Sequence, residues 1–193
     1  MITPSIFIDI DTQESFFREN DLVSAEDIKS VRANLKKLTA HALAKRIKII
    51  SLIDDGLKID KAVLKKDLKK LKETVVDEKA TQIGPQEKIA DLKKTWKKSH
   101  QLVLQKTGFD VFTNPNFLKL IKASRIKNII VYGYGIDFGI EKAVVNLVAK
   151  GYKIWIPVDA VLAINELNRE PSVKEMHRLG VQMWNSEFVI ANT

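Results

Sequence analysis

The sequence contains no cysteine among its 193 residues. This absence excludes disulfides, thiolate metal ligands and a thiol nucleophile together, although it says little about the cellular compartment. No apolar run approaches the roughly 20 residues that a membrane-spanning helix needs. The first residues, MITPSIFIDID, enter an apolar run without a basic start. We therefore expect no signal peptide, no membrane partner and a cytoplasmic protein.

Acidic residues are too few to balance the basic ones, and the formal net charge is +8. Many of the lysines lie in a lysine-rich segment at about 58–98. One interpretation is a site for nucleic acid or another polyanion; the other is a solvated helical face. The segment has no arginine, and Trp96 is its one aromatic residue, so bases would find little to stack on. We favour the solvated face and expect that nucleic acid is not a partner.

Apolar runs alternate with helical patterns along the chain, and hydrophobic residues make up 45% of it. This alternation predicts a mainly parallel sheet with helices on both faces, a Rossmann-like, three-layer α/β/α fold. Its length suits a single domain over residues 1–193 that includes the lysine-rich helical segment. The six expected strands are 5–11, 47–53, 102–105, 129–132, 152–158 and 181–183.

Capping residues mark several expected helices. Ser24 suits the start of a helix that ends near residue 44, and Asn114 followed by Pro115 suits the start of another. Gly151 suits the end of a helix that begins near residue 138. Pro171 is expected to interrupt the helical pattern after the fifth strand.

A glycine-rich turn follows the fourth expected strand, with glycines at 133, 135 and 139. Ligands of open α/β sheets bind at the carboxyl ends of the strands, so this turn is the predicted site. Asp137, within the turn, suits the N-cap of the next helix, and we favour that role over a catalytic one.

Three segments resemble motifs of the isochorismatase-like cysteine hydrolases. GYGIDFGI at 133–140 resembles the family's G-x-x-T-D-x-C-V turn, and IDIDTQESF at 8–16 resembles its first strand and D-x-Q-x-x-F motif. LQKTGFDVF at 104–112 resembles its K-x-x-[YF]-x-x-F motif. The motifs follow the family's order and span most of the chain. The chain is thus similar to a divergent member of this family, and the resemblance implies a homo-oligomer.

The resemblance also assigns the site. It places the catalytic aspartate at Asp11, the catalytic lysine at Lys106 and a glycine, Gly139, at the position of the catalytic cysteine. Further residues are expected to line a site for a small-molecule ligand: Tyr134, Gly135, Phe109 and Phe138. A cis peptide bond that is frequent in the family would fall between Tyr134 and Gly135. Without a thiol, cysteine-dependent amidase activity, including that of a nicotinamidase, is excluded.

Isochorismatases of siderophore and phenazine pathways also have glycine at that position, and their aspartate protonates a vinyl ether before water completes the hydrolysis. The resemblance therefore implies acid–base hydrolysis of a small carbonyl or anionic ligand by Asp11 and Lys106. The sequence departs from that subgroup at Gly108, where an arginine is expected, and at Gly135, where a tyrosine is expected.

The alternative is a pseudoenzyme that serves as an oligomeric interaction scaffold and contacts a polyanion through its lysine-rich surface. An open pocket at Asp11 and Lys106 would favour the hydrolase. A site filled by Tyr134, Phe109 or Trp184 would favour the scaffold.

We expect neither a metal nor another cofactor. Nicotinamidases of this superfamily hold a metal through aspartate and histidine after the second strand. Here that place has Asp54 and Asp55 but no nearby histidine. The histidines at 41, 100 and 177 lie on separate expected elements, without the spacing of a metal site.

Overall fold

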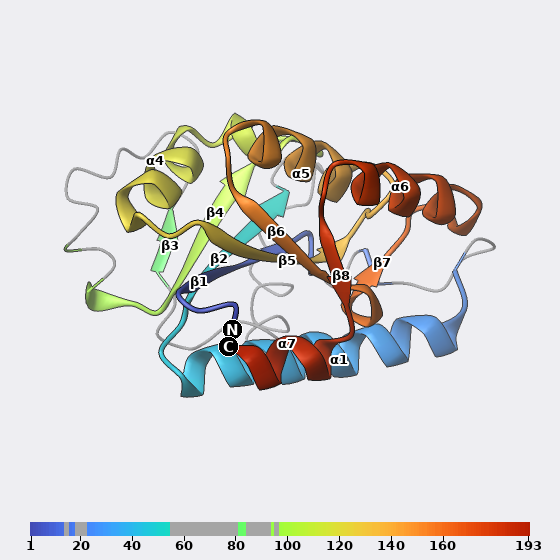
Figure 1. The fold of residues 1–193 in the computed structure, drawn as a ribbon, viewed down its shortest axis with the longest axis horizontal. Helices are drawn as coiled ribbons and strands as arrows, with labels where there is room; N and C mark the ends of the chain where they lie inside the picture. The colour runs from blue at the N-terminus through green and yellow to red at the C-terminus, as the bar shows by residue number, and fades with distance from the viewer. Residues whose placement is uncertain (14–15, 18–22, 55–80, 84–93, 95–96) are drawn as a thin grey trace, which may run out of the picture.

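The fold has three layers, as Figure 1 shows for a computed structural model that describes residues 1–13, 16–17, 23–54, 81–83, 94 and 97–193. Helices α1 (Ala25–Ala44) and α7 (Ser186–Asn192) cover one face of a sheet. Helices α4 (Pro115–Ser124), α5 (Gly139–Ala149) and α6 (Glu166–Arg178) cover the other. The predicted α/β/α arrangement is confirmed.

Every strand pair in the described residues is parallel, and the strand order is β3-β4-β2-β1-β5-β6-β8, with β7 also paired to β5. The sheet has eight strands rather than the six predicted. The two missed strands, β3 and β7, have three and two residues, too few to show a periodicity. The strand bounds are β1 Ser5–Ile10, β2 Lys48–Asp54, β3 Thr81–Ile83, β4 Gln101–Lys106, β5 Asn128–Tyr134, β6 Lys153–Pro157, β7 Val161–Leu162 and β8 Gln182–Trp184.

The core is built on the central strands β1, β2, β4 and β5, whose apolar side chains are buried on both faces. Such continuous apolar runs are typical of parallel strands that lie between two helical layers. Asp9 is the exception within β1, since its carboxyl group is fully buried in the middle of an apolar strand. The carboxyl ends of the central strands meet at one edge, and this edge holds the candidate site.

Two of the predicted helix starts are confirmed. The Ser24 side chain accepts a hydrogen bond from the Asp27 N–H at 3.1 Å, and the Asn114 side chain accepts one from the Asn116 N–H at 2.9 Å. The predicted interruption at Pro171 is wrong, because α6 runs through this residue. Proline removes one backbone hydrogen bond, and buried Met176 and Ser172, whose hydroxyl donates to Glu141 of α5 at 2.6 Å, hold the helix in place.

The helical prediction for the lysine-rich segment falls mostly on residues outside the described ones. Of its described part, Thr81–Ile83 forms β3, next to the Gly84-Pro85 pair that interrupts the helical pattern, and residues 94, 97 and 98 are helical. The two chain termini lie side by side, and the Ile2 N–H donates to the Asn192 carbonyl at 2.9 Å. Among the described residues, every helix is too short or too polar to cross a bilayer.

Candidate functional site

The candidate residues lie at the carboxyl ends of strands β1, β4 and β5, at one edge of the sheet. Asp11 directly follows β1, Lys106 is the last residue of β4, and Tyr134 is the last residue of β5. Because the strands are parallel and in register, with Ile10 opposite both Leu52 and Gly133, their carboxyl ends coincide. The fold thus brings Asp11 and Lys106 together from positions far apart in the sequence.

Asp11 and Lys106 form a fully buried ion pair. The Lys106 Nζ lies 2.8 Å from Asp11 Oδ1, and both side chains have 0% exposure. The same ammonium group donates a hydrogen bond to the Gly108 carbonyl at 2.6 Å. Besides Lys106, neither carboxylate oxygen of Asp11 has a hydrogen-bond partner. A buried acceptor without a partner is rare in folded proteins, so the Asp11 carboxylate is a candidate acceptor for a donor group of a ligand.

The backbone and electrostatics of Asp11 are both unusual. Its φ is +54°, in the left-handed region that few non-glycine residues adopt. Its N–H donates to the Leu52 carbonyl at 2.9 Å, which fixes the turn against β2. Burial raises the pKa of the Asp11 carboxyl to about 6, while the Lys106 ammonium opposes that rise. A carboxyl group with a pKa near neutrality and strained backbone geometry is typical of a functional site.

A network of polar side chains that the sequence analysis did not single out supports this pair. Thr12 Oγ1 donates to Asp9 Oδ1 at 3.1 Å and Ser51 Oγ to Asp9 Oδ2 at 2.6 Å, which holds the side chain two residues before Asp11 in place. The Gln13 side chain forms two hydrogen bonds with the Asp54 backbone, at 2.7 and 3.2 Å. Desolvation raises the pKa of Asp9 to about 7 despite its two hydroxyl donors. The signal for Asp9 was present in the sequence as a charge inside an apolar run.

The Asp54 carboxylate connects the network to the lysine. Its Oδ1 accepts the Gly108 N–H at 3.0 Å, and the carbonyl of Gly108 accepts from Lys106. Asp54 is therefore engaged by the loop after β4. Among the described residues, no group of three histidine, aspartate or glutamate side chains is arranged to hold a metal ion.

Gly133 brings β5 into close backbone contact with β1. Its φ is +125°, and a Cβ atom there would overlap the Ile10 carbonyl oxygen. Gly135, with φ +83°, follows at the turn, where its N–H donates to the Leu162 carbonyl at 2.8 Å. The cis bond expected between Tyr134 and Gly135 is absent, because the cis peptide bond of the described residues is Thr3–Pro4.

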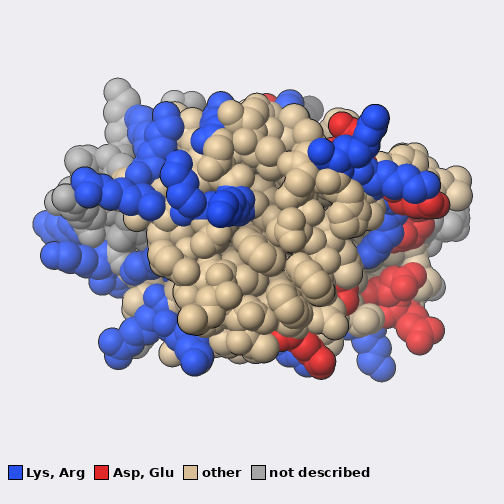
Figure 2. All heavy atoms as spheres, viewed as in Figure 1, with Lys and Arg blue, Asp and Glu red and all other residues tan. Residues whose placement is uncertain are grey.

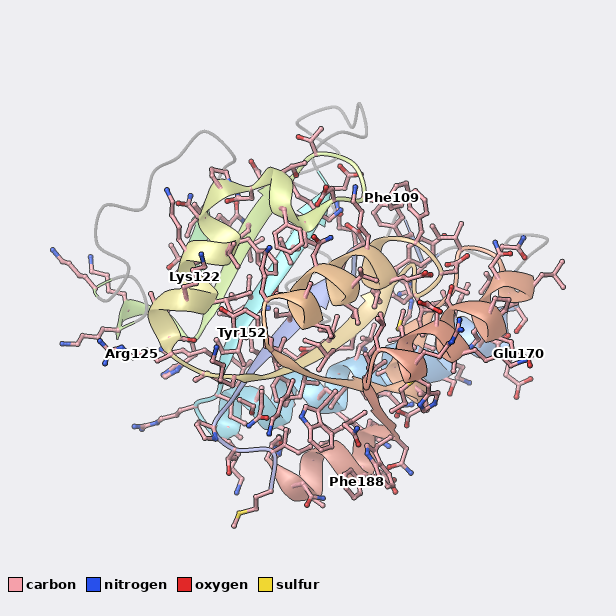
Figure 3. All side chains as sticks on the ribbon, turned by 45° about the horizontal axis from the view of Figure 1, so that its top comes forward. Phe109, Lys122, Arg125, Tyr152, Glu170 and Phe188 are labelled. Atoms are coloured by element: carbon pink, nitrogen blue, oxygen red, sulfur yellow. The ribbon has the colours of Figure 1, made fainter. Side chains whose placement is uncertain are left out.

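The space beside Gly139 is occupied by Phe109. A Cβ atom at position 139 would lie 3.4 Å from the Phe109 carbonyl oxygen and 3.7 Å from its ring carbon Cδ1. The Phe109 ring lies edge to face with Phe138, with 5.0 Å between centroids, and 6.0 Å from the Lys106 Nζ. Figure 3 shows Phe109 at the end of the sheet where the site lies. Phe109 thus stands between the buried lysine and the first turn of α5.

Tyr134 packs away from this pair of rings. It contacts Phe16 and Phe17, with centroid distances of 5.1 and 6.0 Å. Trp184 stacks on Phe188 of α7 at 4.2 Å, and Figure 3 shows Phe188 far from Phe109. Of the three aromatic residues considered as fillers of the site, Phe109 is the one that lies against Gly139.

Asp137 is not the N-cap of α5, contrary to the prediction. The N-cap is Phe138, and the Asp137 carboxylate instead accepts the N–H groups of Ile164 and Asn165, at 2.7 and 3.0 Å. The aspartate therefore joins the turn to the segment before α6. Beside it, a surface hollow of about 290 Å³ runs along α5 and is lined by Asp137, Phe138, Glu141, Lys142, Val145 and Asn146.

The chain is similar to proteins of one family. The sequence profile described as "Isochorismatase domain" matches residues 5–187, whereas no curated protein sequence matches. Nicotinamidase/pyrazinamidase PncA from Bacillus subtilis superposes with a TM-score of 0.67 at 16% identity, covering 94% of this chain and 99% of that one.

Two further solved structures share the fold. MAR1 ribonuclease from Caenorhabditis elegans has a TM-score of 0.62 at 19% identity, covering 97% of this chain and 80% of that one. The YcaC gene product of Escherichia coli, described as an octameric hydrolase of unknown specificity, has a TM-score of 0.62 at 15% identity, covering 96% and 77%. At these identities the likeness establishes the fold alone.

Proposed function

Because this chain belongs to the isochorismatase family, we propose that it binds a small carbonyl or anionic ligand and hydrolyses it by acid–base chemistry, without a covalent intermediate. The observation that carries the proposal is the buried Asp11–Lys106 pair, in which Asp11 Oδ2 has no hydrogen-bond partner. The solved neighbours are named for very different substrates, including nicotinamide and RNA, so the proposal rests on these residues rather than on the fold.

The chemistry follows from the protonation state of Asp11. With a pKa of about 6, its carboxyl group is partly protonated near neutral pH and can act as a general acid. For a vinyl ether, the acid protonates the vinyl carbon and water adds to the resulting cation to give a hemiketal. The ether C–O bond of the hemiketal then breaks, as its hydroxyl becomes the carbonyl and the hydroxyl proton passes to the leaving alcohol oxygen. The proton released by the water returns to the carboxylate. The Lys106 ammonium stabilises that carboxylate and an anionic group of the ligand throughout.

A second function is favoured by the position of Phe109. Its ring and carbonyl lie against Gly139, where the family resemblance places the nucleophile. If Phe109 stays in place, its ring separates a ligand near Gly139 from Lys106, and the chain serves as a non-catalytic, oligomeric scaffold. The proposed hydrolase instead requires the Phe109 ring to move aside. The two functions therefore differ in the mobility of one side chain.

The first experiment measures turnover of a panel of small vinyl ethers and esters that carry a carboxylate. We expect hydrolysis that falls at least a hundredfold in Asp11→Asn and in Lys106→Met, while both variants stay folded by circular dichroism. The rate of the unaltered protein should decline as pH rises above about 6, since the acid then loses its proton. A rate that rises with pH would exclude Asp11 as the acid, and absence of turnover across the panel would favour the scaffold.

The second experiment uses the absence of native cysteine, since each introduced thiol is then the only one in the chain. We compare alkylation of Gly139→Cys, of Gly139→Cys with Phe109→Ala, and of Ala149→Cys at the exposed opposite end of α5. Gly139→Cys alone should react more slowly than Ala149→Cys because Phe109 covers it.

Removing the Phe109 ring should raise the reactivity of the thiol at position 139 about tenfold or more. It should also give that thiol a lower pKa than the control, because it lies at a helix N-terminus beside a buried cation. A thiol that remains unreactive without the ring would show that the site is closed for another reason, and the scaffold function would then stand.

A further inference from the structure

The opposite edge of the sheet carries a concentration of positive charge. The amino ends of β2, β4, β5 and β6 lie together there, and basic residues occupy the segments that lead into them. We call this surface the basic edge; its exposed members are Lys45, Arg46, Lys97, Lys98, Lys119, Lys122, Arg125, Lys127, Lys150 and Lys153. Figure 2 shows a group of lysine and arginine side chains at the left of the view, whereas at the right basic and acidic side chains are mixed.

Acidic residues are missing from every segment that forms the basic edge. Residues 44–48, 97–100, 116–128 and 149–154 contain no aspartate or glutamate. In the described part of the chain, the ion pairs of exposed side chains lie elsewhere, as in Lys142–Asp110 and Lys174–Glu170. In Figure 3, Lys122 and Arg125 lie at one end of the molecule and Glu170 at the other. The described part of this edge therefore carries a net positive charge.

Helix dipoles account for part of this arrangement. Lys45 and Lys150 are C-caps, and Lys122 and Arg125 lie at the end of α4, where positive charge is stabilised by the helix dipole. The dipoles do not account for Lys97, Lys98, Lys127 and Lys153, which lead into strands or begin them. These residues extend the charge across the sheet from β4 to β6.

We infer that the basic edge is a binding surface for the phosphate backbone of nucleic acid. Five adjacent strands, β4-β2-β1-β5-β6, span about 19 Å at the usual strand spacing. A duplex presents about ten phosphate charges over that length. Flexible lysines in a row suit contacts to phosphates, which position the nucleic acid without reading its sequence.

A membrane surface fits the same charge less well. Stable membrane attachment needs an apolar anchor in addition to basic residues. Of the exposed large apolar residues in the described part of the chain, Phe138, Val145, Leu167 and Trp184 lie on other segments, and Met1 alone is near the amino end of β1. The observations therefore favour a nucleic acid over a lipid bilayer.

The test is binding of the whole protein to a fluorescently labelled 20-base-pair DNA duplex, measured by anisotropy between 50 and 300 mM salt. One variant combines Lys122→Gln, Lys127→Gln and Lys153→Gln, and a second combines Lys45→Gln, Lys97→Gln and Lys98→Gln. The matched control removes the same charge from exposed lysines on the outer side of α1, as Lys29→Gln, Lys36→Gln and Lys37→Gln. All three are surface changes that we expect to leave the fold intact.

Each edge variant should weaken binding about tenfold or more and reduce the slope of log K against log salt by roughly 2 to 3, while the control changes affinity less than twofold. The result should not depend on the base sequence. Equal losses in the control and the edge variants would overturn the assignment to this edge, as would absence of binding at 50 mM salt. Binding to vesicles with 30% phosphatidylserine but not to DNA would also overturn it. Neither outcome bears on hydrolysis at the opposite edge.

Discussion

Charged residues differ between the carboxyl edge of the sheet, where the strands end, and the amino edge, where the strands begin and the basic edge lies. At the carboxyl edge one aspartate and one lysine are fully buried against each other, beneath glycine turns and aromatic rings. At the amino edge, the described cations of the basic edge are exposed to solvent and lie in segments without aspartate or glutamate. Buried charges are costly unless they are paired, whereas solvated charges contribute little to folding. The structure of the carboxyl edge therefore depends on packing around a buried ion pair, whereas the main property of the amino edge is its net charge.

This difference determines how each edge responds to substitution. A change at the carboxyl edge should alter stability strongly, because backbones and charges there have no room to rearrange. A change at the amino edge should leave the fold intact and alter only association with anions. Matched substitutions at the two edges test this contrast.

The largest difference is expected for two glycines. Gly133→Ala at the carboxyl edge places a methyl group on the Ile10 carbonyl in a backbone conformation that favours glycine, and it should cost more than about 4 kcal/mol of unfolding free energy. Gly151→Ala at the amino edge, with φ +78° and no atom within 4 Å of the added Cβ, should cost about 1 kcal/mol. Urea unfolding measures both, and equal losses would contradict the contrast.

A smaller difference is expected for two lysines. Lys106→Ala leaves the Asp11 carboxylate buried without its partner, which should lower the unfolding free energy by about 3 to 5 kcal/mol. Lys127→Ala removes an exposed ammonium and its contact over the Tyr152 ring, 5.0 Å from the centroid, and should cost less than about 1 kcal/mol. Adding Asp11→Asn to Lys106→Ala should recover part of the loss. If it does not, the loss comes from packing rather than from the unpaired charge.

The sequence predicts the carboxyl edge better than the amino edge. Motifs at 8–16, 104–112 and 133–140 are local, and each follows an apolar strand, so strand alternation was enough to bring Asp11 and Lys106 to one end of the sheet. The places of Phe109 and Gly139 in their motifs did not indicate that the two residues would be in contact. That contact depends on the path of the loop after β4. Asp137 was assigned to the wrong partner for a similar reason, because the N–H groups that donate to its carboxylate come from a segment 27 and 28 residues later.

The basic edge could not be read from linear spacing. Its residues lie in short groups that are far apart in the sequence. The strand order brings these groups together by making β4, β2, β5 and β6 near neighbours, and this order depends on long-range contacts. The sequence drew attention to the lysine-rich segment instead, most of which lies outside the described residues. The prediction that nucleic acid is not a partner was based on that segment alone.

The last prediction concerns pH, which should act through the buried carboxyl groups of the carboxyl edge. Burial raises the folded-state pKa of Asp9 from 3.8 to about 7, so the folded protein binds its proton more tightly than the unfolded chain. This contribution to stability is complete below pH 4 and is lost as pH rises to about 7. The free energy of unfolding of Asp9→Asn should therefore rise relative to that of the unaltered protein by about 4 kcal/mol between pH 4 and 8.

Chemical denaturation at each pH gives the difference between the two proteins. Ser51→Ala provides a second check, because Ser51 donates a hydrogen bond that lowers the pKa of Asp9. Without this hydrogen bond, the free energy of unfolding should continue to decline with pH beyond pH 7. The decline that remains in Asp9→Asn should end near pH 6, where Asp11 loses its proton. A difference between Asp9→Asn and the unaltered protein that stays constant with pH would show that Asp9 is already ionised in the folded state. The carboxyl edge would then hold a second buried negative charge, stabilised by hydroxyl donors alone.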